Sequence, residues 1–404
     1  MAFNCLNCFQ TRFFTNRINF PKGNLIDMRR KNFYNTAAHK QPEDLVLDLG
    51  GCPLSGMEGS SHSKLMALLG YSGYESMMGY GVDERILQYL DIDTRGVGWI
   101  FRPEKSVYNQ ISDTEYIDEW GIRRVFTGLY WDIIENPLRG ASIKDLESYP
   151  FPDPYSVSRA DIDRVIADAK KLYEETDYVI CASHPCYGVF ELACWLCGFD
   201  DFMIKMAIEP EFAEALFAKI FEYQRIVSEM YYSSVGSYIH YTSSGDDFAT
   251  QQSTFVSPGM FREMIMPCFK ERIGLTKKYT RAKFLHHSCG NVSSIIPDLI
   301  ESGVEILNPI QPTNEKMDPR VLKERFGERI VFHGGLDTQA LLPKGDRESI
   351  YEGVDQLLKA VSPGGGYIFA AAHNIQEDVP PENIVHMFQA ARKLYQRANG
   401  VYHQ

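Results

Sequence analysis

The feature that most constrains the fold is a regular alternation of short apolar runs with longer amphipathic segments after residue 154. The short runs are rich in β-branched and aromatic residues, which is typical of buried β-strands, and the longer segments have the apolar spacing of α-helices. The expected strands cover 178–184, 238–247, 282–290, 304–311, 329–337 and 366–374, and the expected helices cover 211–231, 258–279, 292–303, 319–326 and 347–361. Strands that alternate with helices in this way pair in parallel, and the helices cover the sheet.

Six such units after an αβ opening favour a (β/α)8 TIM barrel over an open doubly wound sheet. The phosphate-binding patterns Gly-x-Gly-x-x-Gly and Gly-x-x-x-x-Gly-Lys-Ser/Thr are both absent, so nucleotide-binding folds lack their best support. We therefore expect one α/β barrel domain over residues 28–404, in which 155–404 hold the main barrel repeats.

The region 28–154 is expected to be an irregular α+β segment that leads into the barrel. Its pattern predicts a short strand at 45–51, helices at 61–75 and 83–92, and a hairpin at 123–134, where apolar and polar residues alternate. The proline-rich stretch "SYPFPDPYS" then predicts a linker.

The first 27 residues differ from the rest of the chain, since they have no periodic apolar face and no signal-peptide pattern. We expect either a disordered extension or a start codon placed upstream of the true beginning at Met28. Cys5 and Cys8 form a single Cys-x-x-Cys with no second pair nearby, which is a weak signal for a metal or redox site.

The composition excludes several classes of protein. The chain has 53 acidic and 41 basic residues and a formal charge of −12, and it has no long basic run, which argues against a nucleic-acid partner. It has no stretch of about eighteen apolar residues, so we expect no membrane span. Nine scattered cysteines favour free thiols in a reducing compartment, and we expect a cytoplasmic protein.

Polar, reactive residues follow the expected strands, where the carboxyl ends of barrel strands converge on one face and build active sites. The residues at these ends are His184, Asp246, Asp247, His287, Cys289, Asn308, Gln311, His333, Asp337 and His373. Generic loops favour Ser, Gly, Lys and Glu, whereas these positions are rich in His, Asp and Cys. We therefore expect one shared site at the barrel mouth.

His287 and Cys289 lie two residues apart at a strand end, so both side chains point to the same face and could hold one ion. His373, at the end of the last expected strand, could complete a His/Cys/His set with an open or carboxylate fourth position, which suits catalytic zinc. Asp246 or Asp247 could add a ligand, and His333 could replace one of the three. His286 should point to the opposite face and serve a structural role.

Three motifs in the last third of the chain are similar to those of the uroporphyrinogen decarboxylase superfamily. "HSCGN" resembles the His-x-Cys-Gly metal motif of its zinc- and cobalamin-dependent methyltransferase branch, "GGLDTQALLP" resembles its Gly-Asn-Leu-Asp-Pro segment, and "AAHNIQEDVPPENI" resembles its closing block. The resemblance runs from about Met28 to the C-terminus. It implies the (β/α)8 barrel, bound zinc, and methyl transfer between a small methylated compound or thiol and the methylcobalamin of a partner corrinoid protein.

The two branches of this superfamily differ at a few positions. The methyltransferase pattern has a cysteine as third ligand where this chain has His373, and the decarboxylase pattern has a histidine there. However, the arginine-rich motif that holds substrate carboxylates in decarboxylases corresponds to "LDLGGCPLSGM", which has no arginine, and Cys194 replaces their active-site tyrosine. Decarboxylation of a porphyrinogen or another carboxylated substrate is therefore the alternative, and a non-catalytic barrel that binds a corrinoid protein is a second one.

We hypothesise that zinc activates a nucleophile or a small methylated substrate. Asp246 or Asp247 would orient a ligand or act as general base, unless it only caps the helix that follows. The expected substrate-contacting residues are Arg95, His184, Tyr187, Gln311, His333, Asp337, Asn374 and Gln376. Family members of the decarboxylase type are often dimers, so a homodimer is a further expectation.

Overall fold

The computed structural model describes residues 28–74, 81–128, 130–312 and 315–398, and the extension 1–27 with Cys5 and Cys8 lies outside these residues. Its centre is an eight-stranded sheet in the order β1-β12-β11-β10-β9-β8-β7-β2, in which every neighbouring pair is parallel. The strands are β1 (Val46–Leu47), β2 (Thr94–Val97), β7 (Val179–Ser183), β8 (Tyr241–Gly245), β9 (Lys283–His287), β10 (Ile306–Asn308), β11 (Val331–His333) and β12 (Tyr367–Phe369). The two edge strands approach each other, since the backbone N–H of Asp93 donates to the carbonyl of Leu47 at 3.0 Å.

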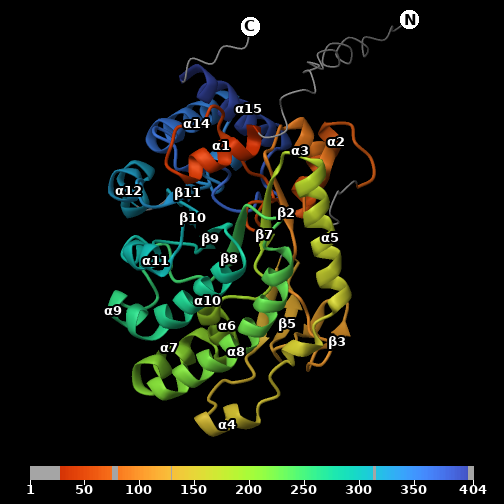
Figure 1. Cartoon of the computed structure of the whole chain (residues 1–404), viewed down its shortest axis with the longest axis vertical. Coiled ribbons are helices and arrows are strands. Elements are labelled where there is room, and N and C mark those ends of the chain that lie inside the picture. The colour runs from red at the N-terminus through yellow and green to blue at the C-terminus, as the bar shows by residue number, and fades with distance from the viewer. Residues whose placement is uncertain (1–27, 75–80, 129, 313–314, 399–404) are drawn as a thin grey trace, which may run out of the picture.

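Helices surround this sheet, as Figure 1 shows, and the expected (β/α)8 barrel is confirmed. They are α1 (Met28–Ala37), α2 (Gly59–Leu68), α3 (Glu84–Tyr89), α4 (Ile143–Ser148), α5 (Arg159–Glu175), α6 (Val189–Cys197), α7 (Phe199–Ile208), α8 (Pro210–Val235), α9 (Pro258–Met260), α10 (Met266–Tyr279), α11 (Ile296–Ser302), α12 (Pro319–Phe326), α13 (Leu341–Lys344), α14 (Arg347–Val361) and α15 (Pro381–Ala398). Short 3-10 turns cover Pro154–Ser156 and Glu315–Met317, and a π-helical turn over Phe261–Ile265 joins α9 to α10. None of the described helices is both long and apolar enough to cross a membrane.

Helix α14 illustrates how local sequence sets these elements. Asp346 accepts a hydrogen bond from the backbone N–H of Ser349, and the Ser349 hydroxyl accepts one from the backbone N–H of Asp346, which forms a capping box at the start of the helix. The buried residues of the helix are Ile350, Val354, Leu357, Leu358 and Val361, which recur every three or four positions. This spacing gives one apolar face that packs on the barrel.

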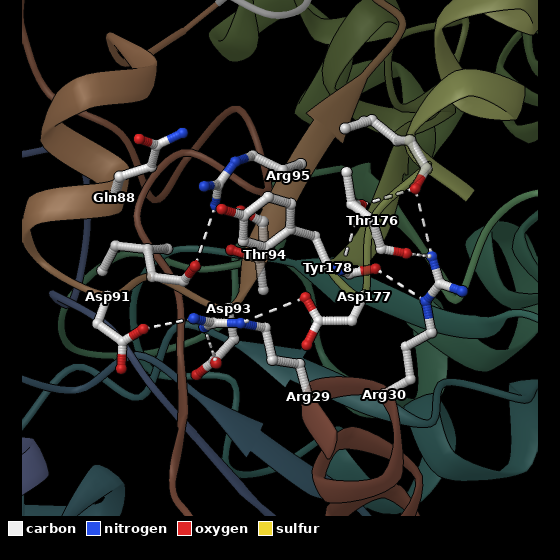
Figure 2. A network of polar contacts seen from close by, with 12 residues as sticks. Arg29, Arg30, Gln88, Asp91, Asp93, Thr94, Arg95, Thr176, Asp177 and Tyr178 are labelled. Carbon is white, nitrogen blue, oxygen red and sulfur yellow. Dashed lines mark hydrogen bonds and ion pairs between the residues drawn. The ribbon is translucent and has the colours of Figure 1, made fainter. Parts of the chain in front are cut away.

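Helix α1 closes the amino-terminal end of the barrel. Its Phe33 is fully buried and packs on inward-facing residues of the strands, including Tyr241, with ring centroids 5.4 Å apart. Arg29 forms ion pairs with Asp91 and Asp93, and Arg30 donates to the backbone carbonyl of Thr176 at 2.7 Å (Figure 2). Because this end is filled, the carboxyl ends of the strands form the open mouth.

The N-terminal segment contains more strands than we expected. The expected hairpin at 123–134 is present, but it belongs to a four-stranded antiparallel sheet of β3 (Asn109–Ser112), β4 (Glu115–Ile117), β5 (Arg123–Phe126) and β6 (Trp131–Glu135). Strand β2 was also not predicted, because Thr-Arg-Gly-Val carries a charge and a glycine in place of an apolar run.

Candidate metal centre

Three ligand-bearing side chains meet at the barrel mouth. His287 is the last residue of β9, Cys289 follows two residues later, and His373 follows β12. One ligand atom from each of the three lies within 4.8 Å of the others, and Cys289 Sγ lies 3.3 Å from His287 Nε2. In a tetrahedral zinc site, a ligand nitrogen and a ligand sulfur are separated by roughly 3.5 Å, given metal bonds of about 2.1 and 2.3 Å. The spacing of His287 and Cys289 is therefore compatible with a shared zinc ion, and His373 lies close enough to be a third ligand candidate.

The orientation of His287 is set by a chain of hydrogen bonds across neighbouring strands. Asn308 pairs in register with His287, and its Oδ1 lies 2.5 Å from His287 Nδ1. Asn308 Nδ2 lies 2.6 Å from His333 Nδ1, and His333 Nε2 lies 2.8 Å from Asp48 Oδ2. Because Asp48 accepts from His333 Nε2–H, His333 Nδ1 is left to accept from the Asn308 amide. Asn308 Oδ1 then accepts from His287 Nδ1–H, so the lone pair of His287 Nε2 faces the site.

Asp48, at the far end of this chain, is fully buried and surrounded by donors. One carboxylate oxygen accepts from the backbone N–H of Gly51 and from the Thr94 hydroxyl, and the other accepts from the Ser55 hydroxyl as well as from His333. Burial alone would raise the pKa of Asp48, but the hydrogen bond from His333, together with those from Ser55 and Thr94, outweighs it, and the pKa is lowered. The carboxylate is therefore ionised and can anchor the chain.

The Cys289 thiol lies in a turn that two side chains hold in place. Asp247 accepts the backbone N–H of Cys289 at 2.8 Å, and Gln311 accepts the backbone N–H of Gly290 at 2.8 Å while its Nε2 lies 3.6 Å from Cys289 Sγ. Burial first, and then the charges of Asp247 and Glu191, raise the pKa of Cys289 to about 12. The thiol is protonated at neutral pH without a cation beside it, and a bound divalent ion would ionise it.

His373 belongs to a loop that is tied to the segment after β1. Gly56 donates its backbone N–H to Asn374 Oδ1 at 2.8 Å and accepts the backbone N–H of Ile375 at 3.0 Å. The His373 ring lies 5.5 Å from the His287 ring, and burial lowers the pKa of His373 to about 4. Its imidazole is therefore neutral at physiological pH, which is the form that binds a metal.

A cavity of about 450 Å³ opens beside these ligands. His287 and His373 contribute to its wall, together with Asp247. The remaining wall is largely aromatic and apolar, and among the described residues that line it there is no lysine or arginine. A volume of this order suits a small molecule.

Two carboxyl groups of this wall, the buried Asp246 and the half-buried Glu191, lie on or against α6. Asp246 accepts the backbone N–H groups of Phe190 and Glu191 and so caps the first turn of that helix, and a Cβ on Gly188 would clash with it at 2.2 Å from Asp246 Cγ. Burial raises the pKa of Asp246 to about 7. Burial, with the charges of Asp247 and Asp246, raises the pKa of Glu191 well above its ordinary value. Sequence reasoning missed Glu191, which lies inside a nearly all-apolar helix.

Several expected site residues do line the cavity or lie beside the ligands. His184 and Tyr187 line it, and His184 is held from behind by the guanidinium of Arg272, whose Nε lies 3.2 Å from His184 Nε2. Gln311 contacts Cys289, as described above. His286 points away from the mouth, as expected, and stacks on Phe248 with ring centroids 5.2 Å apart.

Two expected substrate contacts, Arg95 and His333, do not line the cavity. Arg95 is buried away from the cavity, where it forms a two-bond ion pair with Glu84. Its guanidinium carbon lies 3.6 Å from the centre of the Tyr178 ring (Figure 2). His333 has no exposed surface, and both of its ring nitrogens are engaged by Asp48 and Asn308. In both cases the side chain satisfies another buried polar group instead of facing the cavity.

Three further expected contacts do not line this cavity. Asp337 accepts backbone N–H groups of Gln339 and Leu341 at the start of α13. Asn374 fixes the loop at Gly56, and Gln376 Oε1 accepts from the hydroxyl of Tyr130 at 2.6 Å. These side chains shape the mouth by holding its loops together.

Comparison with known proteins agrees with this architecture. Residues 133–394 match the family model described as uroporphyrinogen decarboxylase (URO-D). Among curated proteins, the uroporphyrinogen decarboxylase of Sodalis glossinidius is 32% identical over 74 residues, and that of Helicobacter hepaticus is 32% identical over 75 residues. These alignments cover 18% and 19% of this chain, and they span only 20% and 21% of the relatives.

Among solved structures, a methyltransferase from Methanosarcina mazei superposes with a TM-score of 0.63 at 16% sequence identity. The alignment covers 91% of this chain and 99% of that protein. At this level of identity, the likeness shows that the two chains share a fold.

Proposed function

Because the chain belongs to the uroporphyrinogen decarboxylase family, we propose that it is a zinc-dependent methyltransferase in which His287, Cys289 and His373 hold the metal. It would move a methyl group from the methylcobalamin of a corrinoid protein to a thiol or other acceptor, or, in the reverse sense, from a small methylated compound to the cob(I)alamin of that protein. The observation that carries this proposal is the convergence of one thiol and two imidazoles at the barrel mouth, with ligand atoms within 4.8 Å of one another. The Methanosarcina mazei protein with the same fold is described as a methyltransferase, which supports the proposal.

Zinc bound here would act as a Lewis acid that lowers the pKa of a nucleophile or polarises the heteroatom that carries the methyl group. The residues of this chain prepare that chemistry. Asn308 presents the Nε2 lone pair of His287, and Gln311 contacts Cys289 Sγ. Asp247, which lies 3.8 Å from His287 Nε2 and lines the cavity, is the candidate to orient a ligand or accept a proton. Asp246 is a weaker candidate, since helix N–H groups occupy both of its oxygens.

An imidazole in place of a second thiolate changes the net charge and the Lewis acidity of the metal centre. A His/Cys/His set carries one negative ligand, so the metal keeps a net positive charge and is a harder Lewis acid than with two thiolates. Such a centre suits an oxygen or nitrogen donor better than a thiol. The donor set therefore favours an ether, alcohol or amine at the reacting end of the substrate.

The charges of the cavity argue against decarboxylation of a porphyrinogen. A substrate with eight carboxylates needs cationic groups to hold it, and the described cavity-lining residues include no lysine or arginine. Cys194, at the position of the decarboxylase tyrosine, is buried in α6 and does not line the cavity. The decarboxylase relatives are aligned over only about a fifth of their length, so their activity does not carry over to this chain.

Metal analysis of the purified protein tests the proposal. Wild-type protein should contain near-stoichiometric zinc, and Cys289→Ala should lose it. Cys268→Ala, which changes a half-buried thiol on α10, is the matched control and should keep the metal. If wild-type protein binds no zinc, the proposal fails.

A spectroscopic assay then tests turnover. Methylation of cob(I)alamin should be observed with at least one compound from a panel of small methyl ethers, amines and thioethers. Stoichiometric zinc without turnover of any methyl donor would instead indicate the non-catalytic barrel that serves as a corrinoid-protein partner.

A further inference from the structure

One wall of the cavity combines aromatic rings with a carboxyl group. Tyr187, Glu191 and Trp195 follow one another at intervals of four residues along and just before α6, so they lie on one face of the helix and all three line the cavity. We call these three residues the α6 wall. The Tyr187 and Trp195 rings lie edge to face, with centroids 5.2 Å apart. Trp99 adds a third aromatic side chain to the lining.

The ionisable side chains around this wall are acidic. Glu191, Asp246 and Asp247 all line the cavity, and the described lining residues include no lysine or arginine. The pKa of Asp246 is raised to about 7 and that of Glu191 well above its ordinary value, so a cation in the cavity would favour the ionised forms of both groups. An anionic ligand would find no cationic side chain on the described wall to pair with it.

Two arginines near the cavity do not line it, although the charge of Arg124 lowers the pKa of Glu191 and the charge of Arg272 lowers that of Asp246. Arg124 lies 4.9 Å from the Trp195 ring centre, but its Nε donates to Asp118 at 3.0 Å, so its charge is paired. Arg272 is fully buried behind His184 and does not line the cavity.

Aromatic faces with a neighbouring carboxylate are the combination that recognises ammonium groups, because the ring quadrupole and the charge both attract a cation within about 6 Å of the ring centre. The rings of this cavity already attract cations from outside, since Arg164 lies 4.7 Å from the Trp99 ring centre and Arg124 lies against Trp195. Burial and the neighbouring carboxylates raise the pKa of Glu191, and a cation beside it would favour its ionised form.

We propose that the small molecule that this site takes carries an ammonium or methylated ammonium group, which lies against the α6 wall while a heteroatom elsewhere in the molecule reaches the metal ligands. This inference rests on the proposed function for the role of the metal end, and it deepens it by naming the class of substrate. The 450 Å³ of the cavity and the oxygen or nitrogen preference of the donor set point to a small amino alcohol or amino ether. A sulfonated or polycarboxylated compound would lack a cationic partner among the described lining residues.

A matched series of three alcohols tests this inference by calorimetric titration. Choline is cationic, 3,3-dimethylbutan-1-ol has the same shape without the charge, and 2-hydroxyethanesulfonate is anionic. We expect choline to bind at least tenfold more tightly than the neutral isostere, and the sulfonate to show no binding. Equal or tighter binding of the neutral or the anionic compound would overturn the inference.

Substitutions test whether the preference for choline over its neutral isostere arises from the α6 wall. Glu191→Gln, which keeps the shape of the side chain, should reduce the preference for choline over its neutral isostere, and Trp195→Leu should reduce it by removing a ring. Glu214→Gln, an exposed carboxyl group on α8, should leave the preference unchanged. Circular dichroism melting confirms that each variant is folded. If folded Glu191→Gln and Trp195→Leu both keep the full preference, the cation is not bound at this wall.

The titrations are run on zinc-loaded and on metal-free protein, with zinc measured in each sample, so that the two proposals can fail separately. Stoichiometric zinc without a preference for choline rejects the substrate class and leaves the metal function standing. A preference for choline in a protein that binds no zinc rejects the metal function and leaves the cation site standing.

Discussion

Asn308 Oδ1 lies 2.5 Å from His287 Nδ1, and this contact determines which nitrogen of the imidazole faces the candidate metal centre. The two residues are partners in the parallel register of β9 and β10, so the backbone itself brings them together. His333, on the next strand, fixes the Asn308 amide in turn, and Asp48 fixes His333. Three adjacent strands thus supply one ligand and two of the residues that orient it.

The first prediction concerns this contact. Asn308→Leu removes the acceptor of His287 Nδ1–H, so the imidazole loses both its fixed tautomer and its fixed orientation. We expect the affinity for zinc to fall by roughly 10- to 100-fold, the usual cost of losing a residue that orients a metal ligand. Competition with a chromophoric chelator measures this affinity.

Asn383 provides the control for this substitution. It is also buried, and its Nδ2 donates to the carbonyls of Leu342 and Gly345, neither of which is a ligand candidate or a residue that orients one. Asn383→Leu should lower the free energy of unfolding without changing the zinc affinity. An unchanged zinc affinity in Asn308→Leu would show that His287 needs no such support.

The second prediction is the pH dependence of zinc binding. The pKa of Cys289 is raised to about 12, so the thiol is protonated at neutral pH, whereas the pKa of His373 is lowered to about 4, so that imidazole is already neutral. Binding should therefore release one proton, and the apparent affinity should rise about tenfold per pH unit between pH 6 and 8. Chelator competition at several pH values measures the slope. A slope of zero or of two protons would contradict the prediction.

The third prediction concerns the buried ion pair between Glu84 and Arg95, a residue that the sequence analysis expected to contact substrate. Arg95→Met leaves Glu84 without its partner in a site where the arginine is 2% exposed and the glutamate 8%. We expect the free energy of unfolding to fall by about 3 kcal/mol or more, with no change in zinc content. Arg159→Met, which breaks an exposed pair with Asp163, should cost less than about 1 kcal/mol. Urea unfolding of both variants makes the comparison.

The main barrel strands could be predicted because each one is an apolar run that ends in polar residues. All six strands expected after residue 154 are present, and the expectation that His287, Cys289 and His373 meet at one mouth agrees with their positions. The barrel topology makes this possible, since it brings every carboxyl end to the same face whatever the separation in sequence.

The residues behind the ligands could be predicted only in part. Asn308 and His333 were recognised at strand ends, but their role depends on strand register, which decides which neighbour each side chain meets. Asp48 precedes a glycine-rich loop with no pattern that predicts four donors around its carboxylate. Glu191 was missed because a single carboxyl group in an apolar helix shows its importance only when the helix face is known.

The last prediction concerns Asp48 and pH. Its pKa is lowered in the folded protein, because the bonds to His333, Ser55 and Thr94 outweigh the effect of burial, whereas the unfolded chain has a pKa of about 3.9. Its contribution to stability is thus fully present above about pH 4 and is lost as the pH falls through the folded pKa.

Asp48→Asn replaces one carboxylate oxygen by an NH2 group. That group cannot accept the hydrogen bonds that the surrounding side chains and backbone donate to the carboxylate. The substitution should therefore lower the free energy of unfolding at pH 7 by about 2 to 3 kcal/mol. The difference from wild type should shrink as the pH falls below 4, since protonation of Asp48 itself then removes the same interactions. Urea unfolding in the presence of a chelator, from pH 7 to pH 3, measures this difference without a contribution from bound metal. The exposed Asp163→Asn should show no such difference at any pH. If the difference in free energy of unfolding between wild type and Asp48→Asn stays constant down to pH 3, then His333 and Asn308 are held in place without a charge on Asp48.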